Sequence, residues 1–389
     1  MNFSLSLDFL IMLLETCMIH LTDYIKSQTA KGNYTGMILI DMQKAFDTVN
    51  HDILCKKLKA MGVKSTKWFQ SYLSERTQLV SVNGATSGFE NVSSGVPQGS
   101  ILGPLLYLCY VNDVKISVSC KIILYADDSA LLVSGKNLEW ISSTLSKELE
   151  NCNNWLVDNH LSMHLDNTEC ILFGTKRKIN KAKNFSVKYK DQEIKSQECV
   201  KYLGVELDQS LSGEKTVNNI IKKSSDRLKF MYRQGKYLDT YTRRLLCNAL
   251  IQPLFDYCAT SWYVNIPKKS KKQLQVMQNK VIRYILNLSP RSHVGSQEFN
   301  KVKMLDVSSR IKLLRLNHVF NIYYNQCPAY LKENFVRLND LHDHNTRGSK
   351  HNFVVHRGEG SEASSFHRVA TGDWNSLPED IKRIKNKLT

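Results

Sequence analysis

Residues 120–133 read Cys-Lys-Ile-Ile-Leu-Tyr-Ala-Asp-Asp-Ser-Ala-Leu-Leu-Val, two apolar arms around a pair of acidic residues. The arms predict a β-hairpin with Asp127 and Asp128 at its tip. Two adjacent carboxylates between apolar strands are costly to bury unless a cation neutralises them. A solvated turn is the simpler interpretation of an isolated Asp-Asp pair, so further carboxylates are needed to favour a metal site.

A third carboxylate follows another apolar run. Residues 36–40 read Gly-Met-Ile-Leu-Ile and predict a buried strand that ends at Asp41. Three carboxylates that converge from neighbouring strands suit two hard divalent cations, which prefer oxygen ligands. Two such ions can clamp the attacking and leaving oxygens of a phosphoryl transfer. Asp41, Asp127 and Asp128 are therefore the candidate catalytic and metal-binding residues.

The charge of the chain is concentrated in its second half. The 389 residues carry a formal net charge of +17. Residues 1–170 hold 13 Lys and Arg against 17 Asp and Glu, whereas the remaining residues hold 40 against 19. This asymmetry indicates a polyanionic partner for the second half, because Lys and Arg displace counterions from phosphates. A basic surface that serves only solubility is the alternative.

Cysteine spacing and hydropathy indicate an intracellular protein without a membrane span. The ten cysteines are scattered singly without a C-x-x-C pair, as expected of free thiols in a reducing compartment, nuclear or cytoplasmic. The apolar run from Phe9 to Leu14 is too short to cross a bilayer and predicts a core helix that continues toward Tyr24.

Periodicity and turn residues predict the remaining elements. Asn83-Gly84 favours a tight hairpin turn after residues 78–82. In the C-terminal region, Trp374 and Leu377 are interpreted as packing residues. Helices are expected at about 51–61, 68–73, 101–111, 137–155, 242–257 and 271–286 and from 216 onward, and strands at 170–173 and 202–207.

Five segments follow one another along the chain: Ile40-Asp-Met-Gln-Lys-Ala-Phe-Asp-Thr-Val-Asn-His51, Ser94-Gly-Val-Pro-Gln-Gly-Ser-Ile-Leu-Gly-Pro-Leu-Leu106, Tyr125-Ala-Asp-Asp128, Trp155-Leu-Val-Asp-Asn-His-Leu-Ser-Met163 and Tyr202-Leu-Gly-Val-Glu-Leu-Asp208. In this order they resemble motifs of the reverse transcriptases of non-LTR (LINE-type) retrotransposons. The long Pro-Gln-Gly segment is the most specific of the matching motifs.

The resemblance implies an α/β fold, in which a palm-type polymerase domain has a small antiparallel sheet with flanking helices. Residues 1–209 would form this palm with residual fingers, 210–290 a helical thumb, and 291–389 a basic C-terminal region of unknown role. The implied activity is RNA-directed DNA synthesis, in which a primer 3′-hydroxyl attacks a dNTP with two Mg²⁺ ions, or with Mn²⁺ in their place.

The resemblance also implies roles and partners. Phe46 would stack under the incoming sugar and exclude a 2′-hydroxyl, and Gln98 and Gly99 would line the nucleotide and template pocket. An RNA template, a DNA primer and their RNA–DNA duplex would be the partners, without a membrane. Four residues of the thumb would meet phosphates: Lys222, Lys223, Arg227 and Lys229.

Two departures from the family pattern predict weakened activity. Only Lys26 and Lys31 are basic before Asp41, so the fingers are expected to be truncated and to lack a preceding N-terminal endonuclease. Asn167 stands where the family has a Lys that is thought to protonate the leaving pyrophosphate, and an amide cannot act as that acid. The alternatives are a nucleic-acid-binding remnant without polymerase activity and a host protein that uses its basic half as an RNA-binding module.

Overall fold

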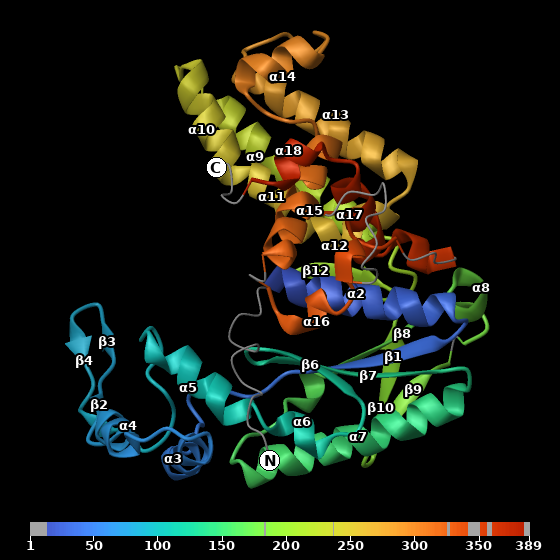
Figure 1. The fold of residues 1–389 in the computed structure, drawn as a ribbon. Helices are drawn as coiled ribbons and strands as arrows, with labels where there is room; N and C mark the ends of the chain where they lie inside the picture. The colour runs from blue at the N-terminus through green and yellow to red at the C-terminus, as the bar shows by residue number, and fades with distance from the viewer. Residues whose placement is uncertain are drawn as a thin grey trace. The chain divides into compact units, whose positions relative to one another are not determined.

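Two compact units make up the chain in a computed structural model, drawn as a ribbon in Figure 1. The structure describes residues 14–340, 351–355 and 360–384, except residues 183, 236, 325 and 326. The first unit holds residues 34–172 and 181–197, and the second holds the described residues of 14–33, 173–180 and 198 onward. Residues 9–13 of the expected apolar run lie outside the described residues, but the helix expected to reach Tyr24 is present as α2, Leu14–Ala30.

The first unit is built on a six-stranded sheet, so the α/β fold class is confirmed. All seven residues of its β1 strand are buried, as expected for an apolar run in the middle of a sheet. β8 and β10 pair in parallel. The sheet is therefore mixed instead of wholly antiparallel. The parallel pair arises because a β-hairpin that ends in β10 brings the chain back beside β8. In pairing order the strands are β6 (Lys121–Tyr125), β7 (Asp128–Gly135), β1 (Tyr34–Ile40), β8 (Glu169–Phe173), β10 (Gln192–Gln197) and β9 (Ser186–Tyr189).

Helices pack beside this sheet, and the longest of those in the first unit is capped at its first turn and packs closely against β1. α7 (Leu138–Asp158) begins after Asn137, whose side chain accepts hydrogen bonds from two backbone N–H groups. It approaches β1 closely, because a Cβ atom on Gly36 would lie 2.7 Å from the Leu145 side chain. The other helices are α3 (His51–Ala60), α4 (Thr66–Leu73), α5 (Leu102–Val111) and α6 (Val114–Ser117), and short strands form two ribbons: β2 (Thr77–Gln78) with β5 (Glu90–Asn91), and β3 (Ser81–Val82) with β4 (Ala85–Thr86).

The second unit is mostly helical. The expected strand at residues 202–207 is wrong, because Leu203 and Gly204 adopt positive φ values and turn the chain between two strands. Its elements are α8 (Lys176–Ile179), β11 (Cys199–Tyr202), β12 (Val205–Asp208), α9 (Glu214–Gln234), α10 (Thr240–Leu250), α11 (Gln252–Asp256), α12 (Ala259–Trp262), α13 (Lys268–Ile285), α14 (Ser296–Val302), α15 (Val307–Tyr323), α16 (Ala329–Lys332), α17 (Phe366–Asn375) and α18 (Glu379–Lys382).

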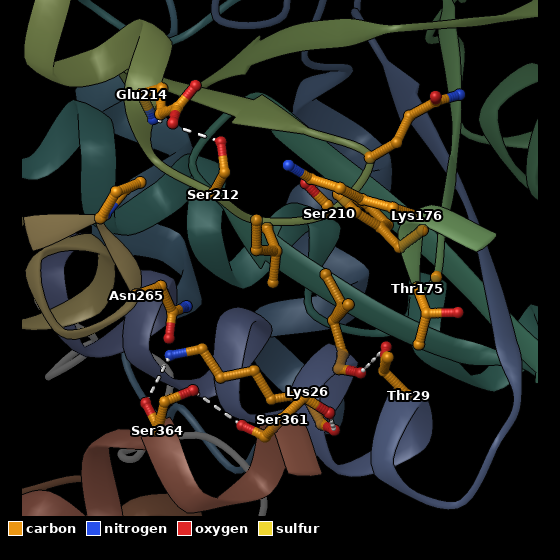
Figure 2. A pocket seen from close by; sticks show the side chains of 16 residues that line it. Lys26, Thr29, Thr175, Lys176, Ser210, Ser212, Glu214, Asn265, Ser361 and Ser364 are labelled. Atoms are coloured by element: carbon orange, nitrogen blue, oxygen red, sulfur yellow. Dashed lines mark hydrogen bonds between the residues drawn. The ribbon is translucent and has the colours of Figure 1, made fainter. Parts of the chain in front are cut away.

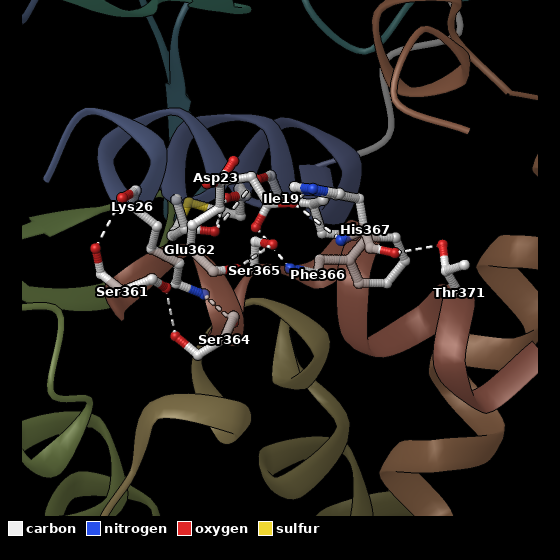
Figure 3. A network of polar contacts seen from close by, with 12 residues as sticks. Ile19, Asp23, Lys26, Ser361, Glu362, Ser364, Ser365, Phe366, His367 and Thr371 are labelled. Atoms are coloured by element: carbon white, nitrogen blue, oxygen red, sulfur yellow. Dashed lines mark hydrogen bonds and ion pairs between the residues drawn. The ribbon is translucent and has the colours of Figure 1, made fainter. Parts of the chain in front are cut away.

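Helix α2 is folded together with the C-terminal elements of this unit. Asp23 accepts hydrogen bonds from the backbone N–H groups of Phe366, at 2.7 Å, and His367, at 3.1 Å, in the first turn of α17 (Figure 3). Ile19 of α2 belongs to the same buried cluster as Trp374, against which Leu377 also packs, so the packing role expected for these two residues is confirmed. No helix in the described ranges is long and apolar enough to cross a membrane.

Candidate active site

The acidic pair lies at the tip of the β6–β7 hairpin. Tyr125 pairs with Asp128 across the hairpin, so Ala126 and Asp127 form a two-residue turn. Ala126 has a φ of 52°, a left-handed conformation that suits tight hairpin turns. Asp127 and Asp128 are both exposed, so solvent or a ligand can reach their carboxylates.

Asp41 lies at the same end of the sheet. β1 pairs with β7 as far as Ile40 opposite Ser129, which makes Asp41 and Asp128 the next residues on two neighbouring strands. Burial raises the pKa of Asp128, and the negative charges of Asp127 and Asp41 raise it further. The three carboxylates therefore repel one another, and a cation bound among them would relieve the repulsion.

A short segment after α7 holds Asp41 from its other side. The backbone N–H of His164 donates to the Asp41 carbonyl at 2.8 Å, and Met42 forms an isolated bridge with Met163. The Asn167 side-chain amide donates to Asp41 Oδ2, also at 2.8 Å. In the ranges that the structure describes, no three acidic, His or Cys side chains are already arranged around a common ion position. Asn167 thus holds one of the two carboxylate oxygens of Asp41 by a hydrogen bond.

Phe46 is half-buried and is supported by an aromatic ring beneath it. It stacks on Tyr107 with 4.6 Å between ring centroids. The Tyr107 hydroxyl donates to Met42 Sδ at 3.2 Å, and burial together with the charge of Asp127 raises the pKa of this tyrosine. The sequence predicted a site residue at Phe46 but not at Tyr107, because an aromatic within the apolar run of α5 is typical of an ordinary core residue.

The Pro-Gln-Gly segment is fastened to the loop after Asp41. Gln98 Nε2 donates to Asp47 Oδ1 at 2.8 Å. Gly95 has a φ of 91°, and a Cβ atom there would lie 2.8 Å from the Asp47 backbone. Gly99 also has a positive φ, of 80°, but faces open space. Gly95 is thus required by the packing of this chain against itself, whereas the space beside Gly99 is free for a ligand.

A polar cleft of about 770 Å³ opens beside this segment. Gln98 and Asp47 line it together with Lys44 and Arg76. Its two basic side chains are exposed. The cleft therefore offers hydrogen-bond donors and positive charge next to the predicted nucleotide residue Gln98.

The predicted thumb residues lie on α9 in the second unit. Lys222, Lys223, Arg227 and Lys229 are all exposed. Two of them already have partners, since Arg227 donates to the Leu250 carbonyl and Lys229 pairs with Asp226 at 3.5 Å. The other two are open to a phosphate group, and their role as nucleic-acid contacts stays a prediction.

Comparison with known proteins identifies a family. Residues 9–207 match the family described as "Reverse transcriptase (RNA-dependent DNA polymerase)". The chain is 26% identical over 264 residues to the RNA-directed DNA polymerase from mobile element jockey of Drosophila melanogaster, covering 65% of this chain and 28% of the relative. It is 27% identical over 286 residues to the probable RNA-directed DNA polymerase from transposon BS of the same species, covering 68% and 30%.

Among solved structures, apo telomerase from Candida tropicalis is similar with a TM-score of 0.38 and 13% identity, over 72% of this chain and 52% of that chain. The chain spans about three tenths of the length of each of the two curated relatives. Members of the matched family generally use divalent metal ions.

Proposed function

Because the chain belongs to the reverse transcriptase family, we propose that it carries the palm of an RNA-directed DNA polymerase from a non-LTR retrotransposon. Asp41, Asp127 and Asp128 would be its catalytic carboxylates. The position of these three residues at one end of a buried sheet, on neighbouring strands, is the observation that supports this proposal. Both curated relatives are named as RNA-directed DNA polymerases of mobile elements.

The donor set fits hard divalent cations. All three candidate ligands are carboxylates, and their mutual repulsion, which adds to the effect of burial in raising the pKa of Asp128, favours positive charge between them. Two Mg²⁺ ions, or Mn²⁺, would be held by Asp41, Asp127 and Asp128. When bound, these ions would neutralise the attacking and leaving oxygens of an in-line phosphoryl transfer.

The surrounding residues would position the substrates. Phe46, fixed by its stack on Tyr107, would lie under the sugar of a dNTP and exclude a ribose 2′-hydroxyl. Gln98, oriented by Asp47, would contact the nucleotide and template, and the open space at Gly99 would admit their backbone. Positioning of this kind supplies much of the catalysis in phosphoryl transfer.

We extend the proposal to partners and domains. The substrates would be an RNA template, a DNA primer, their hybrid duplex and dNTPs. Residues 1–209 would be the palm with residual fingers, residues 210–290 the thumb, and residues 291–389 a basic C-terminal region. A-form duplexes are bound through phosphates and shape, which suits the exposed basic residues of α9: Lys222, Lys223, Arg227 and Lys229.

Single-nucleotide extension of a DNA primer on an RNA template, with the full chain in excess and Mg²⁺ or Mn²⁺ present, tests this function. Asp127→Asn should reduce extension by about 100-fold or more, because it removes a metal-binding charge. Asp158→Asn, which changes an exposed carboxylate at the end of α7, should leave it unchanged. A chain that binds primed RNA but never extends it would instead support a nucleic-acid-binding remnant.

A further inference from the structure

The ammonium group of Lys26 on α2 is buried, and none of the described residues forms an ion pair with it at bonding distance. Only 3% of Lys26 is exposed. Its Nζ atom donates to the Ser364 carbonyl at 2.9 Å (Figure 3), and an ammonium has three donors. Burial lowers the pKa of Lys26, although the charge of Asp23 raises it in part. Among the described residues, Ser364 is its sole hydrogen-bond acceptor.

Asp23, the carboxylate whose charge acts on Lys26, forms its hydrogen bonds with other groups. This residue, one helical turn before Lys26, accepts hydrogen bonds from the backbone N–H groups of Phe366 and His367, and its Oδ2 also lies 3.2 Å from His367 Nδ1. Both of its oxygens therefore face α17 (Figure 3). Buried charges are normally paired or metal-bound because desolvation is costly. A bound anion could therefore serve as the ion-pair partner of Lys26.

A cavity of about 390 Å³ lies against Lys26 (Figure 2). Its wall adds a second cation, Lys176, the side-chain amide of Asn265, and hydroxyl groups that include Ser361. Glu214 is the only acidic side chain of the wall among the described residues, and Figure 2 draws it on the far side from Lys26. Binding sites for small molecules commonly have volumes of about 300–1,000 Å³, so the cavity has room for a phosphate group and part of a larger molecule.

We propose that this cavity binds a phosphate-bearing anion, with the Lys26 ammonium as its ion partner and Lys176 and Asn265 as further donors. Charge-assisted hydrogen bonds to phosphate are among the stronger polar contacts in proteins. All residues that line the cavity belong to the second unit, whereas Asp41, Asp127 and Asp128 belong to the first. The proposal therefore does not depend on polymerase activity.

Calorimetric titration of the full chain at constant ionic strength tests the proposal. Inorganic phosphate should bind saturably, whereas chloride should not. Lys26→Met should weaken phosphate binding about tenfold or more, as expected for loss of a charged hydrogen bond. Lys269→Met, at an exposed position of α13 outside the cavity wall, should bind phosphate as the unchanged chain does.

Two further arms identify the source of the phosphate group. Competition by a nucleoside 5′-monophosphate but not by a single-stranded oligonucleotide indicates a free monoester. Competition by the oligonucleotide indicates a nucleic-acid backbone.

A second variant keeps the proposal testable if Lys26→Met does not fold. Asn265→Leu leaves the Lys26–Ser364 contact intact and should also weaken phosphate binding. Equal phosphate binding in folded Lys26→Met and unchanged chains, or no saturable binding by the unchanged chain, would overturn the proposal and leave Lys26 as a structural donor to Ser364.

Discussion

Asn167 and His164 contact Asp41 from the same short segment, one through its side chain and one through its backbone. The amide of Asn167 can donate a hydrogen bond to the Asp41 carboxylate but cannot give up a proton to a leaving group. At this position the chain therefore has a side chain that orients the proposed catalytic carboxylate of Asp41, but not one that can act as a general acid. The geometry thus gives a physical reason for the weak extension expected from the sequence.

Asn167→Lys should raise the rate of primer extension by about tenfold, at the low end of the effects of general acid catalysis. The reason is that an ammonium can both bind Asp41 and protonate the departing pyrophosphate. Single-turnover extension rates measure the effect, with Asn153→Lys on α7 as a control for added charge. An Asn167→Lys rate equal to that of the unchanged chain would show that protonation does not limit the reaction.

Gly95 and Gly99 offer a matched pair of residues with positive φ. Gly99→Ala should lower the free energy of unfolding by about 1–2 kcal/mol, the cost of a left-handed backbone for an L-residue. Gly95→Ala should cost more, because its Cβ would also collide with the Asp47 backbone. Urea unfolding measures both. Equal losses would mean that the 94–98 segment can move away from Asp47.

At the scale of elements, Asp23 of α2 caps the first turn of α17, a helix far away in the sequence. Asp23→Ala should lower the free energy of unfolding of the second unit by about 2 kcal/mol, the upper range for loss of a helix cap. Thermal or urea unfolding followed by circular dichroism gives the value. Asp158→Ala, at the exposed end of α7, should change stability by less than about 0.5 kcal/mol, and a similar loss in both variants would contradict the capping role.

Elements with local signals could be predicted from the sequence, and those without could not. Asn50 and Asn137 cap the helices that were expected after them, and the β6–β7 hairpin pairs as its apolar arms predict. The turn at Leu203 was missed because leucine with a positive φ has no sequence signature. The Asp23–α17 cap was missed for another reason, since residues 343 positions apart leave no periodic pattern.

In the candidate site as well, the residues of the motifs could be predicted from the sequence, but the residues that hold them in place could not. The three carboxylates follow from apolar strands that end in acidic residues, so the sequence could place them together. The Asn167 bond to Asp41 and the Tyr107 ring under Phe46 depend on how separate segments pack. Only three-dimensional structure reveals such contacts, because each residue alone is compatible with a surface or core position.

At the scale of the whole molecule, electrostatics should dominate the binding of nucleic acid. Replacing four α9 residues by alanine should reduce the slope of log affinity against log salt by up to about 3.6, since each phosphate contact contributes about 0.9 to the slope. Fluorescence anisotropy on a primed RNA gives the slope. The α9 residues are Lys222, Lys223, Arg227 and Lys229, and exposed lysines of the first unit serve as the control set: Lys136, Lys188, Lys190 and Lys195.

An unchanged slope for the α9 variant would place the phosphate contacts on other surfaces. A control set that lowers the slope equally would show binding without a preferred face. Either outcome would contradict the proposed role of α9 as the phosphate-binding surface of a thumb.

The contacts between α2 and α17 also have a consequence for biosynthesis. The Asp23 side chain leaves the ribosome 343 residues before the backbone amide of Phe366 that it caps. At about 5–20 residues per second, translation of that interval takes roughly 17–70 s. During this time the apolar face of α2, with Ile19 and its neighbours, has no native partner from residues 319–374. The nascent chain is therefore expected to be a client for chaperones that cover exposed apolar helices until residues 319–374 have been synthesised.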